Sequence, residues 1–107
     1  MAESRESMVE MTERTSSDKA VRTIQIVNSL GLHARPSALF VQTANKYPSC
    51  RITVSNGADR VNGKSIMGMM TLAAACGTPL TLEISGKDSL LAMEDLCALI
   101  ANKFHEE

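Results

Sequence analysis

The chain has 107 residues, 44% of them apolar and 21% charged, and a formal net charge of −1 at pH 7. This length fits one small domain of ordinary globular composition. Only 3% of the residues are aromatic, so neither charge nor aromatic content favours a nucleic-acid partner. No apolar run approaches the roughly 20 residues of a membrane span, and the N-terminus lacks the apolar core of a signal peptide. We therefore expect a cytoplasmic protein that does not enter a membrane.

The first 20 residues are polar, mixed in charge and without periodicity. Such a segment is typical of a disordered tail, so we predict a tail over residues 1–20 and one folded domain over residues 21–107. The three cysteines, Cys50, Cys76 and Cys97, are widely spaced and odd in number. We expect reduced, largely buried thiols, with no disulfide and no metal site.

The domain opens with alternating apolar residues at 24 and 26, which predict a first strand. A helix is predicted over residues 34–46, because Pro36 suits a first helical turn and apolar residues recur at helical spacing. Two further strands follow, around residues 52–54 and 61. The pair Asn56-Gly57 between them is a strong hairpin signal.

The second half of the chain predicts helix, strand and helix. Ser65 suits the N-cap of a short apolar helix that ends before Gly77, and residues 80–85 alternate as a strand. Asp88 suits the N-cap of a last helix. Its apolar stripe comprises Met93, Leu96, Cys97, Ile100 and Phe104. The order βαββαβα predicts an α+β open-faced sandwich, with three helices covering one face of a four-stranded antiparallel sheet.

The stretch Gly31 to Pro36 (GLHARP) carries the residues best suited to chemistry. His33 lies at a predicted helix start, where unpaired N–H groups and the helix dipole favour anions. Arg35 offers a planar set of donors for phosphate oxygens. Together they suit a transient phosphoryl-imidazole. Taken alone, a histidine at a helix start is usually a surface residue or a weak cap. The adjoining Arg35 and Pro36 bring the functional and the structural interpretation into balance.

A second stretch, Gly63-Lys64-Ser65, resembles the end of a nucleotide-binding P-loop. That motif needs a glycine at position 58, which is Ala58, and we reject it. The helix that follows holds more apolar side chains than a short helix can bury, so we expect some to form an exposed docking patch, although all could belong to the core. They are Ile66, Met67, Met69 and Met70.

These stretches resemble HPr, the histidine-containing phosphocarrier family of the bacterial phosphoenolpyruvate-dependent sugar phosphotransferase system. The resemblance covers residues 21–104. It rests on GLHARP at 31–36, the Asn56-Gly57 hairpin, and NGKSIMGMM at 62–70. The family's open-faced sandwich has the element order predicted above.

The resemblance implies a role for each matching residue. His33 would be phosphorylated on Nδ1, Arg35 would stabilise the phosphate, and Ser65 would be the target of an HPr kinase/phosphorylase. The docking surface for enzyme I, sugar permease EIIA-type domains and, in some lineages, a transcriptional regulator would comprise Ala34, Ala38, Leu39, Gln42, Ile66, Met67 and Met70. Nothing in the sequence demands a metal or an organic cofactor, and we expect a monomer that carries phosphate without being a complete enzyme.

Some features depart from the family pattern. The segment before residue 21 is longer than usual, Leu30 replaces a small polar residue of many members, and Gln42 and Asn45 stand where some members have lysines. The leading hypothesis is a phosphocarrier from enzyme I to permease domains. The alternative is a regulatory phosphoprotein that binds a transcription factor or enzyme through Ser65 and the Met patch. A nitrogen-linked phosphotransfer branch is a third reading.

Overall fold

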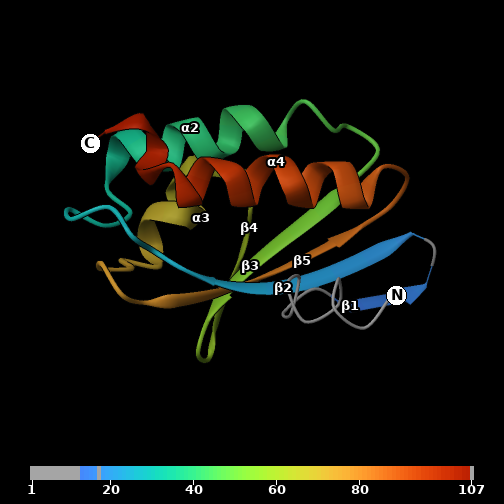
Figure 1. Cartoon of the computed structure of the whole chain (residues 1–107), viewed down its shortest axis with the longest axis horizontal. Helices are drawn as coiled ribbons and strands as arrows, with labels where there is room; N and C mark the ends of the chain where they lie inside the picture. Colours follow the sequence, from blue (N-terminus) through green and yellow to red (C-terminus); the bar gives the residue numbers. More distant parts are fainter. Residues whose placement is uncertain (1–12, 17, 107) are drawn as a thin grey trace, which may run out of the picture.

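Helices form one layer and strands the other (Figure 1). The computed structural model describes residues 13–16 and 18–106. The strands are β1 (Glu13–Ser16), β2 (Lys19–Gln25), β3 (Arg51–Asn56), β4 (Asp59–Asn62) and β5 (Pro79–Ser85). The helices are α2 (Ala34–Ala44), α3 (Ile66–Thr71) and α4 (Ser89–Ala101), followed by a 3₁₀ turn, η1 (Lys103–His105). None of these described helices is long and apolar enough to cross a membrane.

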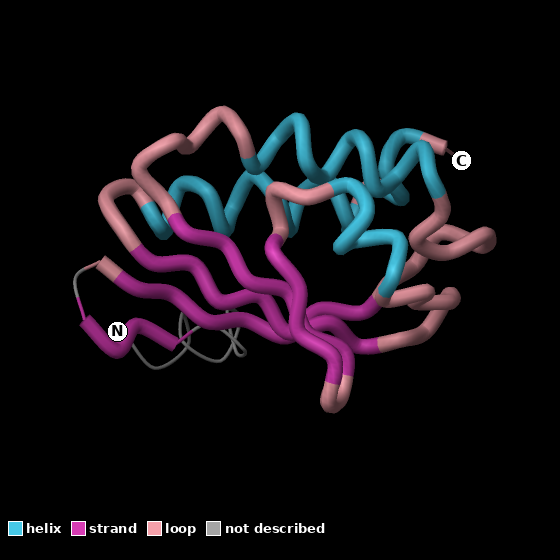
Figure 2. The backbone as a smooth tube through the Cα atoms, turned by 180° about the vertical axis from the view of Figure 1, so that it is seen from behind, coloured by secondary structure: helices cyan, strands magenta, loops and turns pink. Residues whose placement is uncertain are grey.

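The sheet has the order β1-β2-β5-β3-β4, and every neighbouring pair is antiparallel. Alternate residues of the central strand β5, namely Leu80, Leu82 and Ile84, are fully buried. They face the helices, which all cover the same side of the sheet (Figures 1 and 2). Strands β2 to β5 and the three helices confirm the predicted open-faced sandwich.

The predicted tail is wrong for the segment next to the sheet. Residues 13–16 form β1, which pairs with β2 through Glu13 opposite Val21 and Ser16 opposite Lys19. Strand β2 itself begins at Lys19, two residues before the predicted domain start. Backbone pairing at an open sheet edge needs no apolar periodicity, which is why the polar sequence did not reveal this strand. The remaining tail residues, 1–12 and 17, lie outside the described part of the chain.

The helices differ from the predictions mainly at their ends. Helix α3 ends at Thr71, because Ala73 adopts a left-handed backbone with φ of 49°. Asp88 occupies the predicted N-cap position of α4. Its backbone is left-handed, and its side chain accepts no capping hydrogen bond. Phe104 is buried beyond α4, in η1.

Of the three free thiols, Cys76 is exposed, contrary to the expectation of largely buried cysteines.

Two loops pack together at the end of the sheet and fix the entrance to α2. The N–H of Leu32 donates to the carbonyl of Ala74 at 2.8 Å, and the N–H of Ile26 donates to Thr78 at 2.9 Å. Gly31 has a φ of +74°, and a Cβ there would lie 2.5 Å from the Ala74 oxygen. The segment just before His33 therefore depends on a residue without a side chain.

We predict that Gly31→Ala destabilises the fold more than Gly57→Ala does. Both glycines have positive φ, but a Cβ at Gly57 meets nothing within 4 Å. The left-handed backbone costs an alanine about 1–2 kcal/mol in either case, and the clash at Gly31 adds ~1–3 kcal/mol. Urea unfolding of both variants measures the difference. Equal losses would mean that the Ala74 loop moves away freely.

Ser65 caps α3 as predicted. Its backbone is extended, and its Oγ accepts a hydrogen bond from the N–H of Gly68 at 3.0 Å. Met69 is the buried residue of this helix. The first N–H groups of a helix have no intrahelical acceptor, and the Ser65 cap satisfies one of them in this six-residue helix.

Ser65→Ala should cost about 1 kcal/mol of unfolding free energy, because the Gly68 N–H loses its acceptor. Ser65→Thr keeps a hydroxyl acceptor and should cost less. Chemical denaturation of the two variants measures this difference. An alanine variant as stable as the wild type would show that water replaces the cap without loss.

Candidate functional site

His33 is the N-cap residue of α2. Its backbone is extended (φ −87°, ψ −164°), and its carbonyl accepts the first helical bond, from the Ser37 N–H at 3.0 Å. The N–H groups of Ala34 and Arg35 lie in the first turn, where no intrahelical acceptor exists, and Pro36 has no N–H. The imidazole, 38% exposed, thus stands beside donors suited to an anion.

One nitrogen of the His33 ring is held by the chain's C-terminal region. Its Nε2 lies 2.8 Å from Oε2 of Glu106, whose side chain is only 12% exposed. An ionised carboxylate only accepts hydrogen bonds, so Nε2 must carry the proton. In the neutral ring Nδ1 then keeps its lone pair and is the nucleophilic nitrogen.

Glu106 is itself held by Asn28. The Asn28 Nδ2 donates to Oε1 of Glu106 at 2.8 Å and to the carbonyl of Gly31 at 2.8 Å, and Asn28 is fully buried. Sequence reasoning missed both residues. Glu106 lies 73 positions from His33 and 78 from Asn28, and no motif or periodicity links such distant positions.

The other predicted site residue of α2, Arg35, lies two positions after His33 in the first turn. Its side chain is exposed. A guanidinium at this position carries five donors in a plane and a permanent charge. It can therefore approach an anion that rests on the donors at the start of α2.

The predicted docking residues lie on two helices that contact each other, α2 and α3. On α3, Met67 is 78% exposed and Ile66 and Met70 are 43% and 44% exposed, whereas Met69 is fully buried. This distribution confirms that only part of the apolar set belongs to the core. On α2, Ala34 and Gln42 are exposed and Ala38 and Leu39 are half-buried.

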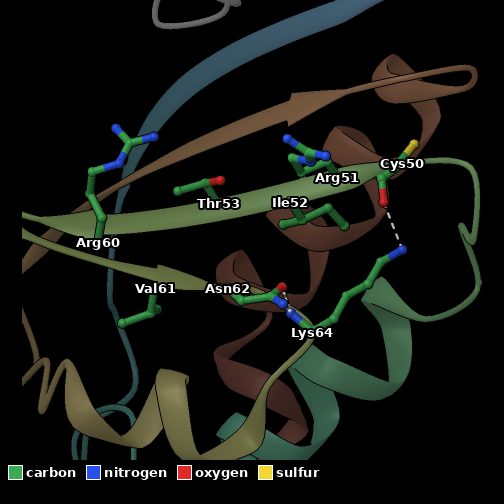
Figure 3. A pocket seen from close by; sticks show the side chains of 8 residues that line it. All are labelled: Cys50, Arg51, Ile52, Thr53, Arg60, Val61, Asn62 and Lys64. Carbon is green, nitrogen blue, oxygen red and sulfur yellow. Dashed lines mark hydrogen bonds between the residues drawn. The ribbon is translucent and has the colours of Figure 1, made fainter.

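Lys64 has a structural position rather than that of a P-loop lysine. Its Nζ donates to the carbonyl of Cys50 at 2.7 Å (Figure 3) and to that of Tyr47 at 2.8 Å. Lys64 therefore joins the segment before β3 to the segment after β4. It borders a groove of about 550 Å³. The lining residues are Cys50, Arg51, Ile52, Thr53, Arg60, Val61, Asn62 and Lys64, which include none of the predicted site residues.

Within residues 13–16 and 18–106, no group of three or more His, Cys, Asp or Glu side chains is arranged to hold a metal ion. The groups that the site offers are those of His33 and its neighbours. These supply a nucleophilic nitrogen, a carboxylate on the opposite side of the ring, and donors for an anion. Such a set suits reversible attachment of a phosphoryl group.

Comparison with known proteins agrees with this chemistry. The family described as "PTS HPr component phosphorylation site" matches residues 20–102. The phosphocarrier protein HPr of Treponema pallidum is 45% identical over 87 residues, or 81% of this chain and 98% of the relative. That of Neisseria meningitidis serogroup A is 51% identical over 85 residues, or 79% and 94%.

A solved structure gives the same result. The crystal structure of HPr-C-His from Thermoanaerobacter tengcongensis superposes with a TM-score of 0.77 at 48% sequence identity, covering 81% of this chain and 97% of that one. Family, fold and sequence thus agree over nearly the whole described domain. The chain therefore belongs to the HPr family of phosphocarrier proteins.

Proposed function

We propose that His33 accepts a phosphoryl group from phospho-enzyme I and passes it to sugar permease EIIA-type domains. The observation that carries this proposal is the bond from His33 Nε2 to Glu106. It directs the proton to one ring nitrogen and leaves the lone pair of Nδ1 for attack on phosphorus.

The transfer step is a displacement at phosphorus by Nδ1 of His33. As the bond from Nδ1 to phosphorus forms, the bond between phosphorus and its donor atom breaks, and the electron pair of that bond stays with the donor. The imidazole gains positive charge, which the Glu106 carboxylate offsets through Nε2. The phosphate oxygens meet the N–H groups of Ala34 and Arg35 and the Arg35 guanidinium. Transfer to the acceptor reverses these steps.

The exposed apolar residues of α3 and the adjoining part of α2 supply the docking surface for both partners. Flexible methionines such as Met67 and Met70 adapt to differently shaped partners. One surface can therefore serve the donor and the acceptor in turn. In this scheme the protein is a monomeric cytoplasmic carrier, and it needs a partner for each half of its cycle.

With enzyme I and phosphoenolpyruvate, the wild type should acquire an acid-labile phosphate and His33→Ala should acquire none. His105→Ala is the matched control, because His105 is the other of two histidines and is exposed. It should be labelled like the wild type. Labelling of His33→Ala at the normal level would exclude His33 as the acceptor.

We further propose that an HPr kinase/phosphorylase modifies Ser65 and thereby lowers transfer to His33. A phosphoserine adds about −1.5 to −2 charges. At an N-cap the helix dipole tolerates this charge, so the fold should survive. Ser65 directly precedes Ile66 and Met67, so the charge would lie at the edge of the docking surface and would repel an acidic partner.

The alternative function, a regulatory phosphoprotein, uses the same surface. In that case phosphorylated Ser65 and the exposed Met67 recruit a transcriptional regulator or an enzyme. The ring geometry at His33 favours the carrier function, because a purely regulatory protein has no need of an oriented imidazole. A nitrogen-linked branch would use the same histidine with other acceptors.

Ser65→Glu should slow phosphorylation of His33 by enzyme I about tenfold, as expected when repulsion weakens docking by about 1.4 kcal/mol. Ser65→Ala, which adds no charge, should react at nearly the wild-type rate. Rapid-quench kinetics at low and high salt separate the charge effect from a loss of structure. A salt-independent defect would contradict the repulsion mechanism.

A further inference from the structure

We propose that Asn28 is a positioning residue that holds Glu106, and with it the C-terminal turn (residues 103–106), against the His33 ring. The proposal rests on the function proposed for His33 and adds the device that orients its imidazole. The side-chain hydrogen bonds of Asn28 go to Glu106 and to the Gly31 carbonyl, so its effect on the His33 ring passes through Glu106.

The C-terminal turn has an unusual backbone. Lys103, Phe104 and His105 follow one another with φ values of 58°, 54° and 60°. Left-handed conformations are unfavourable for residues with a Cβ, and three in succession persist only where other contacts hold them. This turn follows α4 and places the Glu106 carboxylate at the start of α2, 2.8 Å from Nε2 of His33. Figure 1 shows the C-terminal end of the chain close to the start of α2.

Two contacts hold the turn in place. Phe104 is 1% exposed and packs into the core, which fixes the middle of the turn. Its end is fixed by the Glu106 carboxylate, through Asn28 on one oxygen and His33 on the other. Backbone strain next to a side chain that contacts the candidate nucleophile, as Glu106 contacts His33, is typical of a functional constraint.

The side chain of Asn28 acts only as a donor within the described residues. Both Nδ2 bonds are directed to groups that flank His33, the Gly31 carbonyl in the preceding loop and the Glu106 carboxylate. Its Oδ1 is buried without a hydrogen-bond partner within the described residues. Burying an unpaired oxygen is unfavourable, and an apolar residue at this position would avoid it. The amide is therefore explained by what its Nδ2 holds.

The consequence for the site is a fixed tautomer. With Glu106 held by Asn28, its second oxygen faces Nε2 of His33 and keeps the proton there. If Glu106 is released, the proton distributes between the two ring nitrogens. The fraction of protein with a nucleophilic Nδ1 falls accordingly.

The test uses the full chain with Asn28→Asp and Asn28→Ala. Asn28→Asp replaces the donor with a negative charge facing the Glu106 carboxylate and should expel it; Asn28→Ala removes the donor. Nitrogen NMR of the unphosphorylated protein should show both ring nitrogens of His33 sharing the proton. Phosphorylation by enzyme I should slow about tenfold, as for one lost charge-assisted hydrogen bond. Asn45→Asp, the same change at an exposed helix end, should alter neither measurement.

The double variant Asn28→Asp with Glu106→Gln provides a rescue. It exchanges the donor and the acceptor between positions 28 and 106 and should restore the Nε2–H tautomer. The rate should recover only in part, because the neutral glutamine side chain at position 106 no longer offsets the charge on the imidazole. A role in stability alone predicts no such recovery. If the Asn28 variants fail to fold, Glu106→Ala removes the other partner of the contact between Asn28 and Glu106, and Glu106 is the less buried of the two. This variant should show the same change of the His33 tautomer.

Two results would overturn the proposal. One is a folded Asn28→Asp variant with the wild-type tautomer and a rate within about twofold of wild type. A change in rate of about twofold corresponds to less than half of the free energy of a typical hydrogen bond. The other is Glu106→Ala with an unchanged ring. The NMR measurement needs no enzyme I, so a failure of phosphate transfer to His33 would be seen separately from a failure of this positioning contact.

Discussion

The contact between Nε2 of His33 and the carboxylate of Glu106 is the interaction on which the site depends. It joins a helix start to the end of the chain, so three parts of the fold must be correctly placed for it to form. The loop before α2 is held against the α3–β5 loop, α4 is packed on the sheet, and the C-terminal turn brings Glu106 back. The partly exposed imidazole of His33 is thus positioned by contacts from distant parts of the domain.

In the proposed function, the phosphoryl acceptor and the most exposed apolar docking residues lie on different elements. His33 lies at the start of α2, whereas the exposed apolar side chains of Ile66, Met67 and Met70 lie on α3. The helices contact each other, so a partner that covers α3 also approaches the ring. Ser65 caps α3 between these regions in the sequence, where an added charge would change docking without unfolding the helix.

The open face of the sheet takes no part in this scheme. It carries polar and charged residues such as Thr53, Arg60 and Glu83, and Arg60 pairs with Glu83 at 2.9 Å. The edge of β2 is covered by β1. Because β1 is short and polar in sequence, it is less prone to pair with another chain than a long apolar edge strand would be. Both features are consistent with a domain that meets its partners through its helical layer.

The sequence by itself determined the element order, the buried faces, the Ser65 cap and the candidate pair His33 and Arg35, because periodicity, caps and a short motif are local signals. Only the tertiary structure decided that β1 extends the sheet and that Asn28 and Glu106 complete the site. Backbone pairing at a sheet edge leaves no apolar pattern, and residues 78 positions apart meet only when the chain is folded.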